Sequence, residues 1–372
     1  LHTHSSLPFN IIVADNASTD ETATELEPLG RSLFGERFRC IRFHENRNFG
    51  PACNAAAAAA KTTLLFFLNN DTLVTPGWEP PLLDALAEDA TLGGVGPLLL
   101  YQNDMVQHLG VTFSAMGVAH LYRGFPAEHP LAAKRRNFQA ITAAALLMSR
   151  DRFVKHEGFF EEYRNGFEDV DLCLRIYSTG KRFSCIPQSR VYHLESQTPG
   201  RSKNEIHNSR LYRKRCMRLA KTDVHLFAKA DGLVPFIDDL LRIGLRLSDE
   251  EEASLAGLTS ATDWAHTYKL FAQNPLWLGG RVRMAEALER LGKYEEASVL
   301  RYEIAFILES EQAYRDLLHT AVRGGVEAQR EFAEENLKKI LGFKKNKGLA
   351  TAMIDSVLQK ASLNNDSELS EM

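Results

Sequence analysis

The sequence lacks several features that mark large classes of proteins. Its five cysteines include no Cys-x-x-Cys pair and are odd in number, which argues against a disulfide framework and against a zinc knuckle. Its longest apolar stretches, residues 55–60 and 140–148, fall well short of the roughly 18 residues that a membrane-spanning helix needs. These absences favour a globular protein of the reducing cytoplasm, for which any membrane contact is peripheral.

The chain also lacks a large excess of positive or negative charge. The formal net charge is only -4, so the chain has no strongly basic domain of the kind that binds duplex nucleic acid, and no nucleic-acid partner is predicted. Basic clusters at residues 134–136 and 210–221 suit anionic lipid or a sugar diphosphate better. The chain starts at Leu1 rather than Met and shows no leader-like segment, which predicts that its natural N-terminus lies upstream.

The composition is that of an ordinary globular protein. The chain has 372 residues, 44% of them hydrophobic and 25% charged, which is enough for two domains. Strand-like runs at residues 9–15, 39–43 and 63–68 alternate with helix-like segments at residues 52–61 and 78–89. This alternation predicts an α/β layer with a mainly parallel sheet.

Two aspartates stand where predicted strands end. Asp15 closes the first strand-like run, and Asp71 follows the third. Ligands of such sheets bind beyond the carboxyl ends of the strands, so both carboxylates are expected to face one crevice.

The chain changes character near residue 210. Before that point, a helix is predicted from Glu168 onward, and Asp171 and Arg175 are four residues apart and are expected to pair. Beyond it the chain reads as helices, and residues 274–310 resemble a tetratricopeptide repeat, with a generic helical bundle as the alternative. The expected parts are residues 1–210 as the α/β domain, 211–361 as an all-α region and 362–372 as a disordered tail.

Four segments of the first part carry a resemblance to a known family. They are residues 13–20 (Val-Ala-Asp-Asn-Ala-Ser-Thr-Asp), 46–50 (Asn-Arg-Asn-Phe-Gly), 68–71 (Leu-Asn-Asn-Asp) and 168–175 (Glu-Asp-Val-Asp-Leu-Cys-Leu-Arg). In this order and spacing they resemble the inverting family 2 glycosyltransferases of bacterial surface-polysaccharide pathways, including rhamnosyltransferase-like members. The resemblance implies a GT-A fold, a Rossmann-like nucleotide-diphospho-sugar transferase.

The resemblance implies a divalent cation, Mn²⁺ or Mg²⁺, at the donor diphosphate. A hard cation held by carboxylate neutralises the charge of the leaving group. Asp71 is the metal-ligand candidate, although the family usually has Asp-x-Asp where this chain has Asn69-Asn70-Asp71. The cation would then rest on Asp71, the diphosphate and water. His193, after a strand-like segment, is the second metal candidate, and a structural role for it is equally open.

The nucleotide-sugar site is assigned from the same resemblance. Its candidate residues are Asp15, Asn16, Asn48, Gly50, Asn54, Asn69 and Asn70. Asp15 could instead cap the next helix, but Ser18, Thr19 and Asp20 compete for that role, which would free Asp15 for a ligand. A plain loop would also explain the asparagines and glycine at residues 48–54.

Asp169 is the candidate general base. An inverting transfer needs a carboxylate that takes the proton from the acceptor hydroxyl as its oxygen attacks the anomeric carbon. Glu168 would orient the acceptor or raise the pKa of the base. The alternative for Asp169 is a carboxylate that only favours a helix N-terminus.

Two functions follow from these expectations. The first is transfer of a hexosyl or deoxyhexosyl group from a UDP- or dTDP-linked donor to a glycan or lipid-linked acceptor, in the cytoplasm or at the inner face of its membrane. The second is a non-catalytic scaffold that binds protein partners of a polysaccharide-assembly complex through the helical region, because the family's first strand and helix are not seen here.

Overall fold

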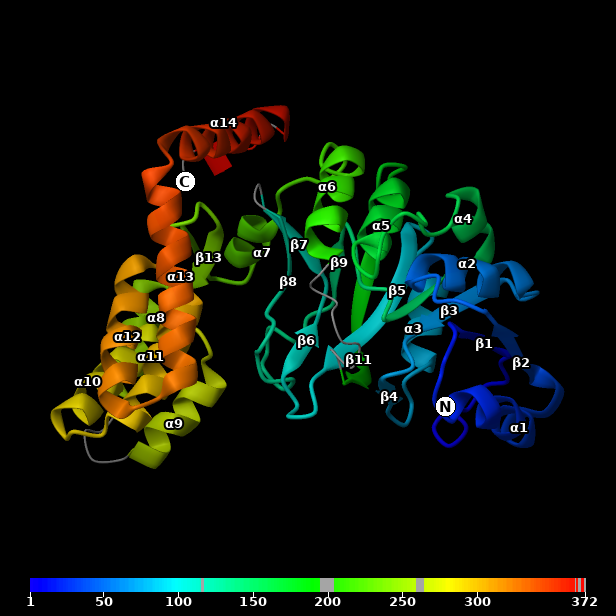
Figure 1. The fold of residues 1–372 in the computed structure, drawn as a ribbon, viewed down its shortest axis with the longest axis horizontal. Coiled ribbons are helices and arrows are strands. Elements are labelled where there is room, and N and C mark those ends of the chain that lie inside the picture. The colour runs from blue at the N-terminus through cyan, green and yellow to red at the C-terminus, as the bar shows by residue number, and fades with distance from the viewer. Residues whose placement is uncertain (115–116, 195–203, 259–263, 365, 367–368, 371–372) are drawn as a thin grey trace. The chain divides into compact units, whose positions relative to one another are not determined.

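The computed structural model describes residues 1–114, 117–194, 204–258, 264–364, 366 and 369–370. These residues form two compact units (Figure 1). The first comprises residues 1–112 and 119–220, and the second comprises residues 113–118 and 221–372. The first unit thus ends beyond the predicted boundary at residue 210, because helix α6 (Glu205–Arg215) packs its inner face on the loop before α5.

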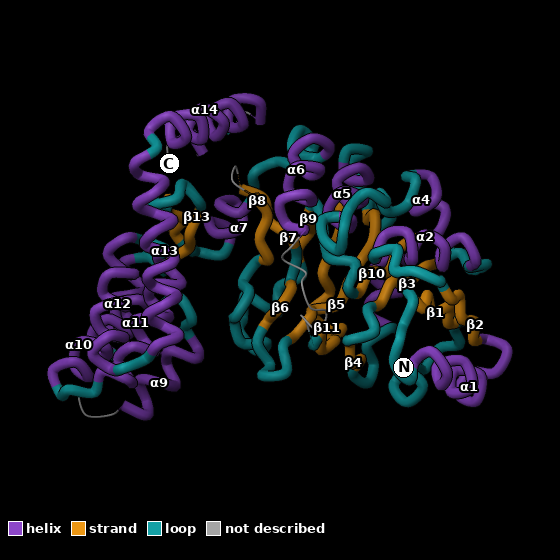
Figure 2. The backbone as a smooth tube through the Cα atoms, viewed as in Figure 1, coloured by secondary structure: helices purple, strands orange, loops and turns teal. Residues whose placement is uncertain are grey.

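The first unit contains the sheets and helices that carry the predicted site. Its strands are β1 (Ile11–Asp15), β2 (Phe38–Arg42), β3 (Leu64–Leu68), β4 (Thr72–Val74), β5 (Leu92–Leu100), β6 (Val106–His108), β9 (Arg136–Phe138), β10 (Ala145–Ser149) and β11 (Arg182–His193). Strands β7 (Val111–Ser114) and β8 (Gly117–His120) each belong partly to this unit and partly to the second. The helices of the first unit are α1 (Thr22–Phe34), α2 (Phe49–Ala59), α3 (Pro80–Glu88), α4 (Arg150–Lys155), α5 (Glu168–Tyr177) and α6, with a 3₁₀ turn at Gly35–Arg37. Figure 2 shows these helices flanking the strands.

The sheets combine parallel and antiparallel pairs. The main sheet has the order β3-β10-β5-β11-β4, with β6 on β5 and β9 on β11, and β1 and β2 form a separate parallel pair. Among the described residues of the main sheet, only β5 and β11 pair in parallel. The expectation of a mainly parallel sheet is therefore corrected to a mixed one. Short links such as that from β5 to β6 are too brief for the crossover that a parallel pair needs.

Strand β5 forms the centre of this unit. All nine of its residues are buried, and helices α3 and α5 both pack on β5 and β11. Gly96 lies against β10 so closely that a Cβ there would stand 2.7 Å from the Ala145 carbonyl oxygen. This buried layer holds the strand ends on which the site is built.

A buried ionic cluster joins α5 to α6. The carboxylate of Asp171, 1% exposed, accepts hydrogen bonds from Arg175 Nε at 2.6 Å and Arg215 Nε at 2.7 Å. The predicted pairing of Asp171 with Arg175 is confirmed. Burial raises the pKa of Asp171, but the hydrogen bonds and charges of Arg215 and Arg175 outweigh burial and hold it below its ordinary value.

We expect Asp171→Asn to lower the free energy of unfolding by about 3 kcal/mol at neutral pH, because it leaves two arginines without their buried counter-charge. Since the pKa of Asp171 is lowered on folding, its stabilisation is complete above the ordinary value of 3.8 and is lost as the pH falls through the folded value. Urea unfolding at several pH values measures this difference. Asp151→Asn, at an exposed site on α4, is the control, and an equal effect of both variants would contradict the assignment.

The second unit is mainly helical. Its helices are α7 (Val224–Ala230), α8 (Asp249–Gly257), α9 (Trp264–Gln273), α10 (Leu278–Arg290), α11 (Tyr294–Leu308), α12 (Glu311–Gly324), α13 (Glu327–Lys345) and α14 (Lys347–Asn364). Strands β12 (Val234–Ile237) and β13 (Ile243–Arg246) form an antiparallel hairpin, so the expectation of an all-α region is corrected. These strands are short, and their alternation of apolar residues is too brief to stand out in a helical context.

Helices α10 to α13 pack on one another in succession, each against the next. Gly292 turns the chain between α10 and α11 with a φ of +75°, a conformation that glycine adopts without strain. The resemblance of residues 274–310 to a tetratricopeptide repeat stays a prediction. Among the described residues, no helix combines the length and apolarity needed to cross a bilayer.

The predicted disordered tail is partly ordered. Helix α14 extends to Asn364, Leu369 is buried, and Asp366 Oδ2 lies 2.9 Å from His225 Nε2. Because Leu369 and Asp366 stand among polar residues, the sequence of the tail does not indicate that they make these contacts. Residues 365, 367–368 and 371–372 of the tail lie outside the described residues.

Candidate functional site

The predicted catalytic and metal-binding residues come together where β3, β11 and α5 meet. Beyond the end of β3, the Asn69 amide donates to the Ala144 carbonyl at 2.9 Å, and the neighbouring Ala143 amide donates to Asp169 Oδ2 at 3.0 Å. The last residue of β11, His193, pairs with Thr72 on β4, next to Asp71. The sheet thus brings residues far apart in sequence to one edge.

Asp71 and His193 form a close pair at this edge. Asp71 Oδ1 lies 3.1 Å from His193 Nε2, and the two side chains are 19% and 8% exposed. The Asp71 oxygen is buried and receives no hydrogen bond from the part of the chain that the structure describes. The side-chain amide of Asn69 approaches the same imidazole nitrogen at 3.4 Å.

Gln107 on β6 fixes the orientation of this histidine. Its Nε2 donates to the His193 carbonyl oxygen at 2.9 Å, so its Oε1 must be the atom that lies 2.6 Å from His193 Nδ1. An amide oxygen only accepts hydrogen bonds, so we assign the proton of the neutral imidazole to Nδ1. The lone pair on Nε2 then points toward the Asp71 carboxylate.

This arrangement fits a divalent cation with two protein ligands. The buried Asp71 oxygen, which lacks a hydrogen-bond donor among the described residues, faces the lone pair of His193 Nε2. Gln107 accepts a hydrogen bond from the other ring nitrogen, and such a partner is usual for a histidine that binds a metal. Over the described residues, no cluster of three or more His, Cys, Asp or Glu side chains could hold a metal. Further ligands would have to come from a diphosphate and water, as Mg²⁺ commonly uses.

Asp169 lies in the first turn of α5. Its Oδ1 accepts a hydrogen bond from the Val170 amide at 2.8 Å, and with the Ala143 contact this fixes the orientation of the carboxylate. Each oxygen keeps a further lone pair for a substrate hydroxyl. Phe167 begins the helix in a left-handed conformation with φ +73°, which turns the chain sharply before Asp169.

Glu168 points back into its own loop. Its Oε2 accepts the Gly166 amide at 2.6 Å, and the residue is 5% exposed. This contact stabilises the turn into α5.

The loops after β1 and β2 are joined by their own polar side chains. Asn16 bonds Asn46 and the carbonyl of Asn48, and the Phe49 amide donates to Asn165 Oδ1 in the loop before α5. Asn48 has φ +66°, which places it in the left-handed region at the start of α2. These contacts bring residues 46–50 beside the loop that precedes α5 and Asp169.

The carboxylate of Asp15 is not available to a ligand, although it was expected to be if Ser18, Thr19 or Asp20 capped the next helix instead. Its side chain is fully buried, accepting hydrogen bonds from the Ser18 amide at 3.0 Å and Arg42 Nε at 2.8 Å. Burial raises its pKa, but these hydrogen bonds and the Arg42 charge outweigh burial and lower it. The carboxylate thus organises its own loop.

Asn54 and Gly50 also have structural contacts. Asn54 exchanges two hydrogen bonds with the backbone of Phe159, at 2.8 and 2.9 Å. Gly50 is buried, and a Cβ there would lie 3.4 Å from Phe159 Cβ. Both residues hold α2 against the segment before α5.

Reasoning from sequence missed Gln107 and its neighbour His108. His108 Nε2 accepts the Thr142 amide at 3.2 Å, and its Nδ1 lies 2.9 Å from His120 Nδ1. Burial, and then the charges of His120 and His193, lower the pKa of His108 well below its ordinary value. Strand β6 is too short to be recognised from a sequence pattern, so the sequence did not predict that its residues lie at the site.

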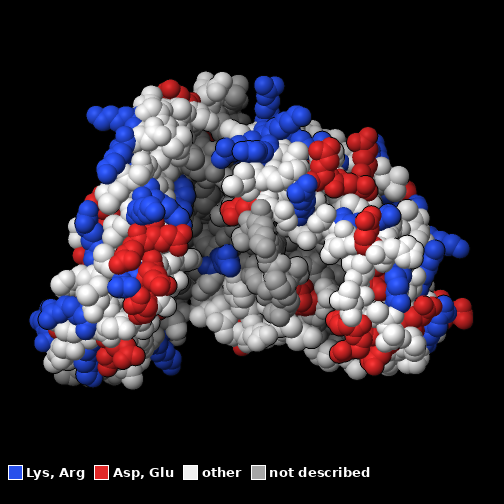
Figure 3. All heavy atoms as spheres, in the orientation of Figure 1, with Lys and Arg blue, Asp and Glu red and all other residues white. Residues whose placement is uncertain are grey.

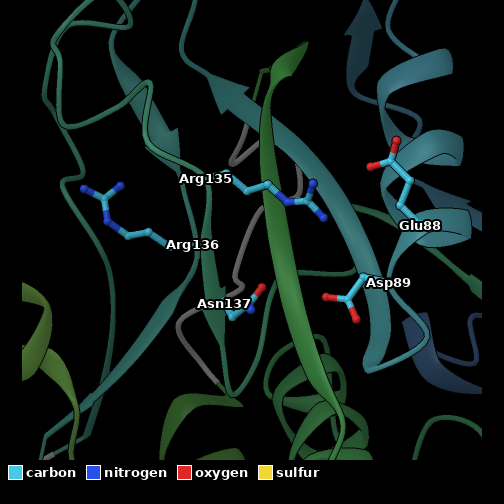
Figure 4. Close-up of a pocket in the computed structure, with 5 residues that line it drawn as sticks. All are labelled: Glu88, Asp89, Arg135, Arg136 and Asn137. Carbon is cyan, nitrogen blue, oxygen red and sulfur yellow. The ribbon is translucent and has the colours of Figure 1, made fainter.

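A surface depression of about 360 Å³ lies elsewhere in this unit. It is lined by Glu88, Asp89, Arg135, Arg136 and Asn137 (Figure 4). Glu88 and Asp89 precede β5, whereas His193 lies at the carboxyl end of β11, beside the end of β5. The depression therefore contains none of the predicted site residues.

Comparisons with known proteins show what this chain is similar to. Residues 2–109 match the family model of Glycosyl transferase family 2. The chain is 32% identical over 200 residues to the uncharacterized protein y4gI of Sinorhizobium fredii, which covers 52% of this chain and 22% of that protein. It is also 32% identical over 194 residues to the O-antigen biosynthesis protein RfbC of Myxococcus xanthus, covering 50% of this chain and 15% of that protein. The chain thus spans less than a quarter of the length of these curated relatives.

Similar solved structures include GalNAc-T7 with UDP, GalNAc and Mn²⁺, with a TM-score of 0.43 and 19% identity over 50% of this chain and 37% of that chain. TarS 1-349 of S. aureus has a TM-score of 0.38 and 14% identity over 89% of this chain and 82% of that chain. Its complex with UDP-GlcNAc has a TM-score of 0.39 and 14% identity over 89% and 83% of the two chains.

The family match and the strand order together confirm the predicted class, an α/β glycosyltransferase fold followed by a helical region. The matched segment includes β1 to β6, with Asp71 and Gln107. Residues 2–109 therefore carry the similarity to glycosyl transferase family 2.

Proposed function

We propose that the chain is an inverting glycosyltransferase that moves a hexosyl or deoxyhexosyl group, such as rhamnosyl, from a UDP- or dTDP-linked donor to a glycan or lipid-linked acceptor hydroxyl. One observation carries the proposal. Asp71 lies in the segment that matches the family 2 model, and its Oδ1, which receives no hydrogen bond from the described residues, faces His193. Asp169 is joined to the same edge of the sheet through Ala143 and Ala144.

The proposed reaction is a single displacement. Asp169 takes the proton of the acceptor hydroxyl while the hydroxyl oxygen bonds to the anomeric carbon and the bond to the diphosphate breaks. When bound, a Mn²⁺ or Mg²⁺ ion neutralises the charge that develops on the diphosphate. Asp71 Oδ1 and His193 Nε2 would hold that ion, and Glu168 supports the turn that presents Asp169.

The donor is proposed to bind beside the joined loops. Asn69 and Asn70 would approach the diphosphate, and Asn16, Asn48 and Gly50 would lie along the nucleotide. Asp15 and Asn54 would act chiefly through the loop geometry that they fix, because their side chains already make internal hydrogen bonds. The acceptor is proposed to reach Asp169 in the cytoplasm or at its membrane.

Donor hydrolysis tests the reaction without knowledge of the acceptor. The full chain is incubated with UDP- and dTDP-linked hexoses and Mn²⁺, with water as the acceptor, and NMR follows the released sugar. We expect nucleoside diphosphate to be released together with a sugar whose anomeric configuration is initially inverted. Release with retained configuration would contradict the single displacement.

Specific observations also favour the scaffold as a second candidate. Asn69 stands where the family usually has an aspartate, and Asp15 is fully engaged within its loop. In that case the helical unit would bind protein partners of a polysaccharide-assembly complex. A scaffold need not bind a nucleoside diphosphate or respond to a change at Asp169, which separates the two candidates.

Replacing Gln107 tests the proposed cation site, because Gln107 orients the proposed ligand His193. We expect Gln107→Met to weaken Mn²⁺ binding in the presence of UDP about 10- to 100-fold, because His193 loses the acceptor that fixes its Nδ1 proton. Gln107→Glu, which keeps an acceptor oxygen, should be less impaired. Electron paramagnetic resonance of free Mn²⁺ measures the affinity. Gln102→Met, at an exposed site before β6, is the control, and unchanged affinity in Gln107→Met would argue against this role.

A further inference from the structure

Helix α6 has a row of cations on its outer face. Arg210, Arg213 and Lys214 are exposed, and Arg218 is exposed in the turn that follows the helix. Residues three, four and eight positions beyond Arg210 lie on one side of a helical path. Over the described ranges, none of these four side chains forms an ion pair, so their charges are not neutralised by the fold.

The inner face of α6 is anchored to the loop before α5, the helix whose first turn contains the candidate base. Asn208 is 3% exposed and bonds both the amide and the carbonyl of Arg164, at 2.9 and 3.0 Å. The ring of Tyr212 lies 5.0 Å from the ring of Phe167, which begins α5. Arg215 bonds Asp171 within α5. The cationic face is therefore held at a fixed position relative to Asp169.

The surface beside these cations is hollowed and carries an apolar residue. Glu205, Ile206, Ser209, Arg210 and Arg213 line a shallow depression of about 390 Å³, and Ile206 is 69% exposed. Figure 3 shows Lys and Arg gathered in the region where Figure 1 places α6. Glu205 is the only acidic residue of this helix.

We propose that this outer face of α6, defined by Ile206, Arg210, Arg213, Lys214 and Arg218, docks the α/β unit on a membrane surface rich in anionic phospholipid. The inference rests on the proposed function, because it explains how a lipid-linked acceptor hydroxyl would be presented to Asp169. Unpaired arginine and lysine side chains match phosphate headgroups in charge, and each basic residue near such a surface adds to binding. The exposed isoleucine can enter the headgroup region beside them.

Co-sedimentation of the full chain with vesicles tests this surface. The vesicles contain phosphatidylcholine alone or phosphatidylcholine with phosphatidylglycerol. We expect binding only to the anionic vesicles, weakened by added salt, and a fall of about 100-fold in the partition coefficient for the triple variant Arg210→Gln, Arg213→Gln, Lys214→Gln. The matched control Arg37→Gln, Arg39→Gln, Lys61→Gln removes three exposed cations elsewhere in the same unit and should bind as the wild type does.

The outcomes separate this surface from the donor site. Thermal unfolding confirms that each variant is folded, and calorimetry with UDP is run in parallel. A wild type that binds UDP but not anionic vesicles would overturn the docking surface alone, as would equal binding by the triple variant. Tighter binding of single-stranded RNA than of vesicles through the same three residues would also overturn it. Vesicle binding without UDP binding would support the surface while the proposed transferase fails.

Discussion

Replacing Asp169 with asparagine is expected to lower the rate of sugar transfer by about 10²- to 10⁴-fold, the usual contribution of a general base. The variant keeps the shape of the side chain and an oxygen that can accept the Ala143 or Val170 amide, so the fold and the donor site should persist. Nucleoside diphosphate binding should stay within a few-fold of the wild type. Steady-state rates and calorimetry on the same preparations measure both quantities.

The control for this change addresses the structural alternative for Asp169. Asp151 is an exposed aspartate in the first turn of another helix, α4, so Asp151→Asn removes a comparable interaction with a helix N-terminus. It should leave transfer unchanged. If Asp169→Asn also left transfer unchanged and only reduced stability slightly, Asp169 would be a helix-terminal carboxylate and the proposed mechanism would be wrong.

The second large effect is expected at Asp71. Asp71→Ala removes the only carboxylate of the proposed cation site, and the remaining His193 nitrogen is a poor ligand by itself for a hard cation. We expect Mn²⁺-dependent binding of UDP to fall below detection, while the unfolding midpoint changes little or rises, because the Asp71 oxygen lacks a hydrogen-bond donor among the described residues.

Asp84→Ala is the control for this variant, because it also removes one carboxylate, at an exposed position on α3. This control should bind Mn²⁺ and UDP as the wild type does. Undiminished Mn²⁺-dependent binding by Asp71→Ala would mean that the cation, if used, rests on other residues.

Much of the α/β unit was predictable because its strands are short apolar runs that end in polar turns. Residues 9–15, 39–43 and 63–68 correspond to β1, β2 and β3 within a few positions. Strand β11 was harder to predict, because its pairing with β5 shifts register between Ile186 and Arg190. Such an irregularity interrupts the alternation that makes a strand visible in sequence.

The candidate site was less predictable than the strands. Asp71 and His193 could be proposed from their places after strand-like runs, but their contact depends on β4 pairing with β11, which no local pattern encodes. Gln107 could not be found, because its role consists of two hydrogen bonds to a residue far along the chain. For Asp15 the sequence predicted a carboxylate available to a ligand, whereas in the structure this carboxylate accepts hydrogen bonds from Ser18 and Arg42.

The most direct test of the account is calorimetric titration of the full wild-type chain with UDP and with dTDP, in the presence and absence of Mn²⁺. The account predicts binding of at least one nucleotide, strengthened by Mn²⁺, because Asp71 and His193 supply only part of the cation's coordination and the diphosphate must supply more. A folded chain that binds neither nucleotide with or without Mn²⁺ would contradict the account and favour the scaffold.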